Sequence, residues 1–251
     1  MKPVRYALIL ACLLALPALC FADGGMGPGP GVKGYSAAST CASGTYKFSW
    51  NGDYSGDTDK GCFNSGGSTK DGTQTNGTIG ASYGQSGNGF RKTANDQNVK
   101  WTIASDDGFD DEVGSLYISA KITDDGTDTA IVLFEAGGDA NNYFKLEITA
   151  DRHLICAHRT GGTTTTASST DTITEGSFVR LGCAWNASTD KLSVKVGTGT
   201  WKDNESGTVN ASGTAFTSIG IGESSLGGTE NDTTDIDDVF VIGTYEGTDP
   251  L

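Results

Sequence analysis

Short segments in which apolar and polar residues alternate run through most of the chain, and this pattern limits its fold more than any other feature. In Tyr143–Thr149 and in Ser177–Trp185, apolar and polar residues largely alternate. A period of two places the apolar side chains on one face of a β-strand. After residue 22, no window shows the 3.6-residue period of an amphipathic helix. The sequence therefore predicts an all-β protein.

Further segments of the same kind are separated by Gly, Asp, Asn, Ser and Thr, the residues that favour turns. Ala150–Arg152 separates two of these segments, which predicts a hairpin. Many short strands at this spacing are typical of an antiparallel two-sheet sandwich, and the chain length suits one such domain. The predicted strands are Tyr46–Trp50, Gly114–Ile122, Ala130–Glu135, Tyr143–Thr149, His153–His158, Ser177–Trp185, Lys191–Val196, Phe216–Ile221 and Asp237–Ile242.

The alternation also assigns faces to the strongest predicted strands. We expect Phe144, Leu146 and Ile148 to face the core and Tyr143, Lys145, Glu147 and Thr149 to face outward. In the same way, Val179, Leu181, Cys183 and Trp185 share one face, and Leu154, Cys156 and His158 share another, so Cys156 and Cys183 can both point inward.

The N-terminal residues have the pattern of a secretory signal peptide. Lys2 and Arg5 give a basic start, an apolar run covers Ala7–Leu16, and small residues precede a cleavage point after Ala22. A lipoprotein signal at Cys20 is disfavoured, because the residue before it is a leucine and not a small residue.

This leader defines the predicted organisation of the chain. We expect residues 1–22 to be the signal peptide, residues 23–34 to be a flexible Gly- and Pro-rich linker, and residues 35–251 to form one sandwich domain. The apolar run is too short to span a bilayer comfortably. We therefore expect a protein that is secreted or displayed at the cell surface, with no membrane insertion after the signal is cleaved.

The composition disfavours several classes of protein. The chain has 17 Lys and Arg against 31 Asp and Glu, so its net charge is −14, and this charge opposes binding to nucleic acid. Only 19% of the residues are charged, while 37 are Gly, which does not suit a helical bundle or a coiled coil.

Four cysteines follow residue 22, and an even number in an exported chain predicts two disulfides. We favour Cys41–Cys62 and Cys156–Cys183, because these are the pairs that are nearer in sequence. The two other connectivities and four free thiols stay open as alternatives. A zinc site is disfavoured because no C-x-x-C spacing occurs.

The order of these elements resembles the concanavalin A-like, laminin G-like (LamG) jelly-roll superfamily, in its bacterial secreted and pentraxin-related branches. The resemblance covers about residues 46–245. It rests on the strand–turn–strand unit Gly176–Val196 and on the closing strand Ile236–Ile242, which contains Ile-Asp-Asp-Val. It implies two curved antiparallel sheets and extracellular recognition of glycans or protein surfaces, often with calcium.

Hydrolases of this superfamily carry three acids that alternate along one strand, and no predicted strand here has them. Glu135 and Glu147 lie on separate predicted strands and can meet across a sheet, but solvated surface acids are the simpler interpretation. The Gln-x-His of the alginate-lyase branch and a nucleophile-elbow sequence are also missing. We therefore expect a protein that is not an enzyme.

Clustered Asp side chains on loops are the sequence signal for Ca²⁺, which prefers hard oxygen ligands. The resemblance to glucanase-like sandwiches assigns a structural calcium to the Asp of the closing strand, which corresponds to Asp237. The predicted ligands are Asp237, Asp235, Asp107 and Asp53. The alternative is that these residues only form turns and keep the chain soluble.

A glycan site needs an aromatic ring and polar partners. Trp201 lies among residues typical of a loop and is the strongest candidate for an exposed ring, while Tyr143, Lys145 and Glu147 are predicted to share one outward face. The sequence thus favours a secreted non-catalytic module that binds a glycan or a cell-surface protein, as in adhesion. A structural protein that associates with itself through Thr- and Gly-rich edge strands is one alternative. A glycoside hydrolase or polysaccharide lyase of the same fold is another.

Overall fold

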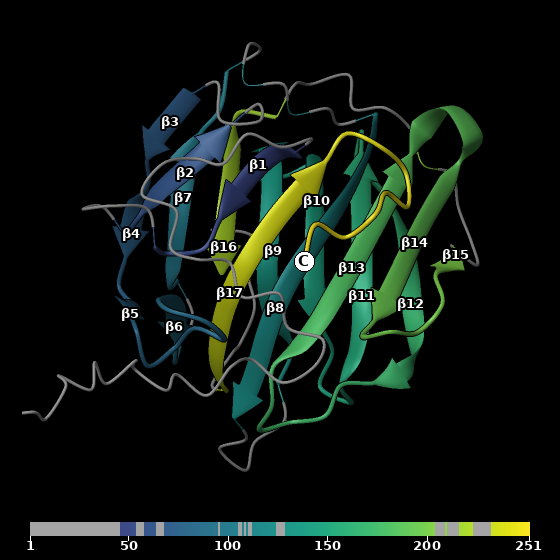
Figure 1. Cartoon of the computed structure of the whole chain (residues 1–251). Coiled ribbons are helices and arrows are strands. Elements are labelled where there is room, and N and C mark those ends of the chain that lie inside the picture. The colour runs from purple at the N-terminus through teal and green to yellow at the C-terminus, as the bar shows by residue number, and fades with distance from the viewer. Residues whose placement is uncertain are drawn as a thin grey trace, which may run out of the picture. The chain divides into compact units, whose positions relative to one another are not determined.

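Two antiparallel β-sheets enclose a common hydrophobic core (Figure 1). This computed structural model describes residues 46–53, 58–63, 68–94, 96–104, 107, 109, 112–123, 129–203, 209, 216–222 and 232–251. The strands all belong to one compact unit, Tyr35–Pro250. The predicted fold class, an antiparallel two-sheet jelly-roll sandwich, is confirmed. The predicted signal peptide and linker lie outside the described residues.

The first sheet, sheet A, contains 10 strands. Its order is β15 (Lys202–Asp203), β14 (Lys191–Val196), β13 (Val179–Asn186), β8 (Val113–Thr123), β17 (Thr233–Ile242), β1 (Tyr46–Trp50), β2 (Lys60–Phe63) and β3 (Ser68–Asp71). Two further strands branch from β17: β6 (Gly89–Lys92) pairs with β17, and β5 (Thr78–Gly80) pairs with β6.

The second sheet, sheet B, contains 7 strands. Its order is β12 (Thr163–Thr172), β11 (His153–Thr160), β10 (Asn142–Ile148), β9 (Ile131–Asp139), β16 (Ser218–Gly222), β7 (Asn98–Thr102) and β4 (Thr73–Thr75). A short 3₁₀ turn, Ala187–Thr189, connects β13 to β14, and the Asn186 side chain caps it by accepting the backbone N–H groups of Ser188 and Thr189.

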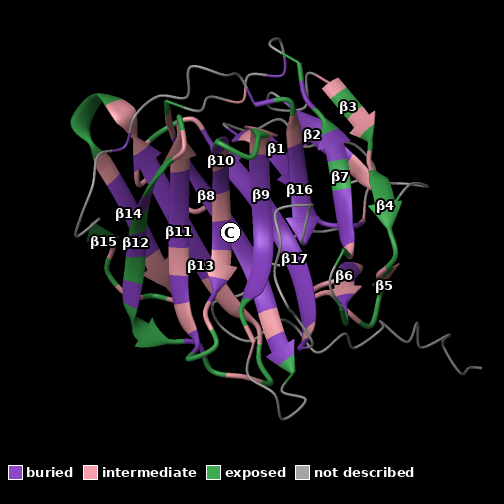
Figure 2. Ribbon diagram, turned by 180° about the vertical axis from the view of Figure 1, so that it is seen from behind, coloured by how far each residue is buried: buried purple, intermediate pink, exposed green. Residues whose placement is uncertain are grey.

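The core lies between the sheets, as the alternation predicts. Phe144, Leu146 and Ile148 of β10 are buried and alternate with half-buried neighbours, a banding visible along β10 in Figure 2. On β13, the predicted inward residues Leu181, Cys183 and Trp185 are also buried. The rings of Phe144 and Trp185, from opposite sheets, lie 4.5 Å apart, so aromatic packing joins the two layers.

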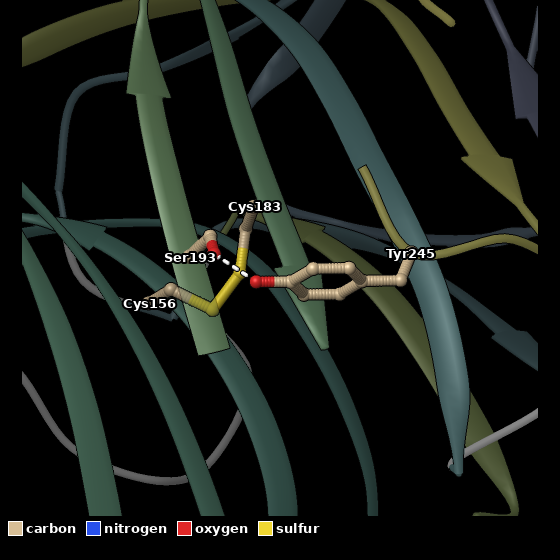
Figure 3. Close-up of a disulfide and its surroundings, with 4 residues drawn as sticks. All are labelled: Cys156, Cys183, Ser193 and Tyr245. Carbon is tan, nitrogen blue, oxygen red and sulfur yellow. Dashed lines mark hydrogen bonds between the residues drawn. A yellow bond between two sulfur atoms is a disulfide. The ribbon is translucent and has the colours of Figure 1, made fainter. Parts of the chain in front are cut away.

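A disulfide links the sheets covalently. Cys156 of β11 is bonded to Cys183 of β13, as predicted (Figure 3). Both residues are fully buried, because the alternation points each of them into the core. Cys62 is also buried and disulfide-bonded, and its predicted partner, Cys41, lies outside the described residues.

The C-terminal segment, residues 243–250, lies against the outer face of sheet A. The Tyr117 hydroxyl donates to the carbonyl of Gly247 at 2.5 Å, and Arg180 holds Asp249 through two hydrogen bonds of 2.9 and 2.8 Å. Within the described ranges, no helix has the length and apolar character required to cross a bilayer.

Candidate functional site

The side chains predicted to bind a glycan lie on different sheets. Trp201 directly precedes β15, at one edge of sheet A, whereas Tyr143, Lys145 and Glu147 project from β10 of sheet B. Since β14 and β15 end sheet A while β10 lies inside sheet B, the structure does not bring Trp201 into the group formed by the other three. A single site therefore contains Tyr143, Lys145 and Glu147 without Trp201.

Trp201 is half-buried and packs on the outer face of sheet A. Its ring centre lies 5.9 Å from that of Tyr117 in an edge-on arrangement, and Lys195 Nζ lies 5.9 Å from it. The ring also covers Gly182, where an added Cβ would meet the indole at 3.0 Å. Much of the Trp201 ring is thus used for packing, which leaves less of it to stack on a ligand.

The outward side chains of three adjacent strands in sheet B form the surface that we call the β10–β12 face. They are Tyr143, Lys145 and Glu147 of β10, Ile155 and Arg159 of β11, and Thr164, Thr166 and Ser168 of β12. The β10 and β11 members are half-exposed, and the β12 members are exposed. This face combines one aromatic ring with cations, an acid and hydroxyls.

Tyr143 and Arg159 lie side by side on this face. They are direct cross-strand partners, and the Arg159 guanidinium carbon lies 5.8 Å from the Tyr143 ring centre. On its other side Tyr143 is paired with Gly137, which has no side chain to cover the ring. Among the described residues Arg159 forms no ion pair, and its Nε makes no hydrogen bond. The ring and the cation are therefore placed to meet a ligand together.

Lys145 and Glu147 follow Tyr143 along β10 on the same face. Lys145 Nζ lies 2.6 Å from Glu147 Oε2, and their side chains keep 16% and 21% of their exposure. Lys145 is paired with Ala157 on one side and with the buried Glu135 on the other. Lys145 is thus the direct cross-strand partner of Glu135 and the salt-bridge partner of Glu147.

A second group, the acidic corner, consists of Asp53, Asp237 and Asp238 around residues 83–88. One Asp237 carboxylate oxygen accepts the backbone N–H groups of Gln85 at 2.8 Å and Ser86 at 3.2 Å. Asp53 accepts the backbone and side-chain N–H groups of Asn88 at 2.8 and 2.9 Å. These carboxylates anchor one loop to the end of β1 and to β17.

Two acids of this corner resist ionisation. Burial, together with the charge of Asp238, raises the pKa of Asp237 to about 8. Burial also raises the pKa of Asp238 to about 6, although the positive charge of Arg180 opposes this shift. Asp238 sits in a register shift of β17 with a φ of 48°, which places two consecutive acids in the corner.

The four predicted calcium ligands are not brought together. Asp235 is held by Arg91 at 2.6 Å and lies 3.6 Å from Lys121, and Asp107 binds Lys70 and accepts the N–H of Ala104 at 2.6 Å. Only Asp237 and Asp53 contact a common loop. In the described part of the chain, no three His, Cys, Asp or Glu side chains gather closely enough to hold a metal ion. Calcium binding stays a prediction, with Asp237 as its strongest candidate ligand.

Comparison with known proteins gives a likeness in structure alone. No protein-family model and no curated protein sequence matches the chain. Among solved structures, the chain is similar to the botulinum neurotoxin serotype C1 binding domain, with 10% identity and a TM-score of 0.57 over 80% of this chain and 49% of that one.

Two related structures give the same picture. One is the binding domain of botulinum neurotoxin DC in complex with rat synaptotagmin II, with 10% identity and a TM-score of 0.58 over 80% of this chain and 48% of that one. The other concerns botulinum neurotoxin type C, whose cell entry depends on interaction with two ganglioside molecules; it has 10% identity and a TM-score of 0.59 over 80% of this chain and 48% of that one. The chain spans about half the length of these domains. At this identity, the likeness shows that the chain shares a β-rich, jelly-roll-like fold with botulinum neurotoxin binding domains.

Proposed function

We propose that the protein is an exported, non-catalytic recognition module of the LamG-like type that binds a glycan at a cell surface through its β10–β12 face. The observation that carries this proposal is the Tyr143–Arg159 pair. A half-exposed ring, bordered by Gly137, lies beside a cation that has no ion-pair partner among the described residues.

The chemistry of this face suits a sugar ring. The apolar face of a pyranose packs against an aromatic side chain, while its hydroxyls need both donors and acceptors. Tyr143 supplies the ring, Arg159 and Lys145 supply donors, and Glu147 supplies an acceptor held in place by Lys145. Thr164, Thr166 and Ser168 add exposed hydroxyls on the neighbouring strand.

The similar solved structures support recognition rather than catalysis. One concerns a toxin that interacts with gangliosides, which are glycan-bearing lipids, and another shows a binding domain with synaptotagmin II. These partners belong to those proteins. A cell-surface protein is the second candidate partner for this chain, because the same face offers charged and aromatic groups to a protein surface.

A glycan array with three forms of the protein tests the proposal. Tyr143→Ala should weaken the parent's glycan binding at least tenfold, which corresponds to about 1.4 kcal/mol. Trp201→Ala is the matched control, since it removes an aromatic ring from the other sheet, and it should bind like the parent. The proposal fails if the parent binds no glycan at millimolar concentration, or if Tyr143→Ala binds as well as the parent. A loss of glycan binding that occurs only in Trp201→Ala would place the site on sheet A instead.

We also propose a structural Ca²⁺ at the acidic corner, held by Asp237, Asp238 and oxygen ligands other than carboxylates, because the described carboxylates alone do not form a three-member metal cluster there. Two buried carboxylates with raised pKa values favour a nearby cation, because a cation offsets the cost of ionising them. The hydrogen bonds that Asp237 and Asp53 make to residues 85–88 would persist, and the ion would stabilise the corner without taking part in any reaction.

A further inference from the structure

The strands that end the two sheets differ sharply in length. The strand order of sheet A ends at β15, with 2 residues, and at β3, with 4. Sheet B ends at β4, with 3 residues, and at β12, with 10. Edge strands in soluble proteins are usually kept short, charged or covered, because their free N–H and C=O groups pair readily with another strand. β12 is the exception in length.

β12 also lacks the charge that protects an edge. β15 consists of Lys202 and Asp203, and β3 ends in Lys70 and Asp71. In contrast, the first eight residues of β12, Thr163–Thr170, contain no charged residue, no proline and no glycine. The pairing with β11 is also regular from Thr163 to Ser168, so no bulge twists this part of the edge away.

The hairpin geometry indicates which backbone groups of β12 point away from β11. Gly161 and Gly162, both with positive φ, form the two-residue turn that joins β11 to β12. Thr160 and Thr163 close this turn, and hydrogen-bonded pairs alternate along an antiparallel ladder from there. The backbone groups of Thr164 and Thr166 therefore point away from β11, toward the edge.

We propose that β12 pairs antiparallel with β12 of a second copy of the chain, so that the two 7-stranded sheets become one continuous sheet. The partner strand must be extended and uncharged, and β12 meets both conditions itself. Thr is a strong strand former, and Thr–Thr cross-strand pairs are favourable. A two-fold axis midway between the two copies of β12 makes the contact self-complementary and closed, which limits assembly to a dimer.

The charge of the chain supports this location. At a net charge of −14, two copies repel each other over most of their surface, so close approach is easiest where a long stretch of backbone carries no acid. The same repulsion predicts that the dimer strengthens as salt screens it. This inference rests on the edge of β12 and does not depend on glycan binding by the β10–β12 face.

Analytical ultracentrifugation of residues 23–251 at 50 and 500 mM NaCl tests the pairing. The parent should form a dimer at micromolar concentration, more strongly at high salt. Thr166→Lys should raise the dimer dissociation constant at least tenfold, because it adds a charge beside the paired edge. Thr73→Lys, on the exposed edge strand β4 of the same sheet, is the matched control and should dimerise like the parent.

A second variant tests the backbone directly. Thr166→Pro removes an N–H that points away from β11 while leaving the ladder to β11 intact, so it should also abolish the dimer. Circular dichroism establishes that each variant is folded before its mass is measured. A parent that stays monomeric at several hundred micromolar in 500 mM NaCl overturns the proposal, as does a folded Thr166→Lys that dimerises as strongly as Thr73→Lys.

Discussion

Tyr143 on β10 and Arg159 on β11 lie directly opposite each other, with the guanidinium carbon 5.8 Å from the ring centre. A cation over a half-exposed ring contributes about 0.5–1 kcal/mol. We therefore expect a double-mutant cycle with Tyr143→Leu and Arg159→Gln to give a coupling free energy of that size, measured by urea unfolding. Additive effects of the two substitutions would show that the ring and the cation do not interact.

The acidic corner predicts that stability falls as pH rises. The folded-state pKa of Asp237, about 8, and that of Asp238, about 6, both lie above the ordinary value of 3.8. Ionising either group therefore costs more in the folded state than in the unfolded chain. Their contribution to the free energy of unfolding is complete below about pH 4 and is lost as pH rises toward 8.

Urea unfolding between pH 5 and pH 9 measures this effect. Asp237→Asn keeps the shape of the side chain without its charge and should flatten the pH dependence. Asp71→Asn, at the exposed end of β3, is the matched control and should follow the parent. If the free energy of unfolding of Asp237→Asn depends on pH as steeply as that of the parent, Asp237 is not the group responsible.

Calcium should restore the stability that the folded protein loses at high pH. At pH 8, a few millimolar Ca²⁺ should raise the melting temperature of the parent, and EDTA should remove the gain, because a ligand that binds only the folded state stabilises it. Asp238→Asn should lose the response, since it removes one of the two adjacent carboxylates. A melting temperature that changes with neither Ca²⁺ nor EDTA would exclude a structural calcium.

Gly87 should be intolerant of a side chain. It has a φ of 85°, and an added Cβ would overlap the carboxylate of Asp53, which is bound to Asn88. Gly176 has a similar φ of 78° but nothing within 4 Å of an added Cβ. We expect Gly176→Ala to cost about 1–2 kcal/mol from backbone strain alone and Gly87→Ala to cost more. Equal urea midpoints of unfolding for the two variants would show that the overlap with Asp53 adds nothing to the cost of the substitution.

The disulfide between the sheets should contribute substantially to stability. Cys156 and Cys183 are separated by 27 residues, and closing a loop of this length stabilises a fold by about 3–4 kcal/mol when the entropy of the unfolded chain dominates. A Cys156→Ala/Cys183→Ala double variant should lose about this amount in urea unfolding. The double variant is preferable to reduction of the parent, because reduction would also break the disulfide of Cys62. Identical unfolding curves would contradict the prediction.

Strands with one apolar face could be predicted from the sequence. The segment Tyr143–Thr149 corresponds to β10, and Asp237–Ile242 is the second half of β17. In β10, burial on a single side leaves an alternation that survives in the sequence, whereas every residue of β17 after Thr233 is buried and the signal there is the apolar run Val239–Ile242. The predicted face of Cys156 and Cys183 is also correct, because both lie in register with buried neighbours.

Strands with polar residues on both faces could not be predicted with the same clarity. The run of Thr in β12 was compatible with a strand or a turn, because its inward residues Thr165, Ala167 and Ser169 carry almost no apolar signal. The short strands β3, β4 and β5 have the same character. Their structure depends on pairing with β2, β7 and β6, which a local pattern does not encode.

The candidate site was predictable only within one strand. Alternation placed Tyr143, Lys145 and Glu147 on one outward face, whereas Arg159 joins them only through the register between β10 and β11. Likewise, the sequence grouped Asp235 with the calcium ligands, while the fold pairs it with Arg91, 144 residues away. Contacts between distant segments decide which charges meet, and spacing along the chain does not reveal them.

The position of the bond between Cys156 and Cys183 also has a consequence for proteolysis. The whole of β12 lies between these two residues in the sequence, together with the turn that precedes it. A protease that cut the exposed Gly161–Gly162 turn would leave two fragments still joined through sulfur. The nicked chain would keep the edge strand beside its sheet, and only electrophoresis under reducing conditions would reveal the cut.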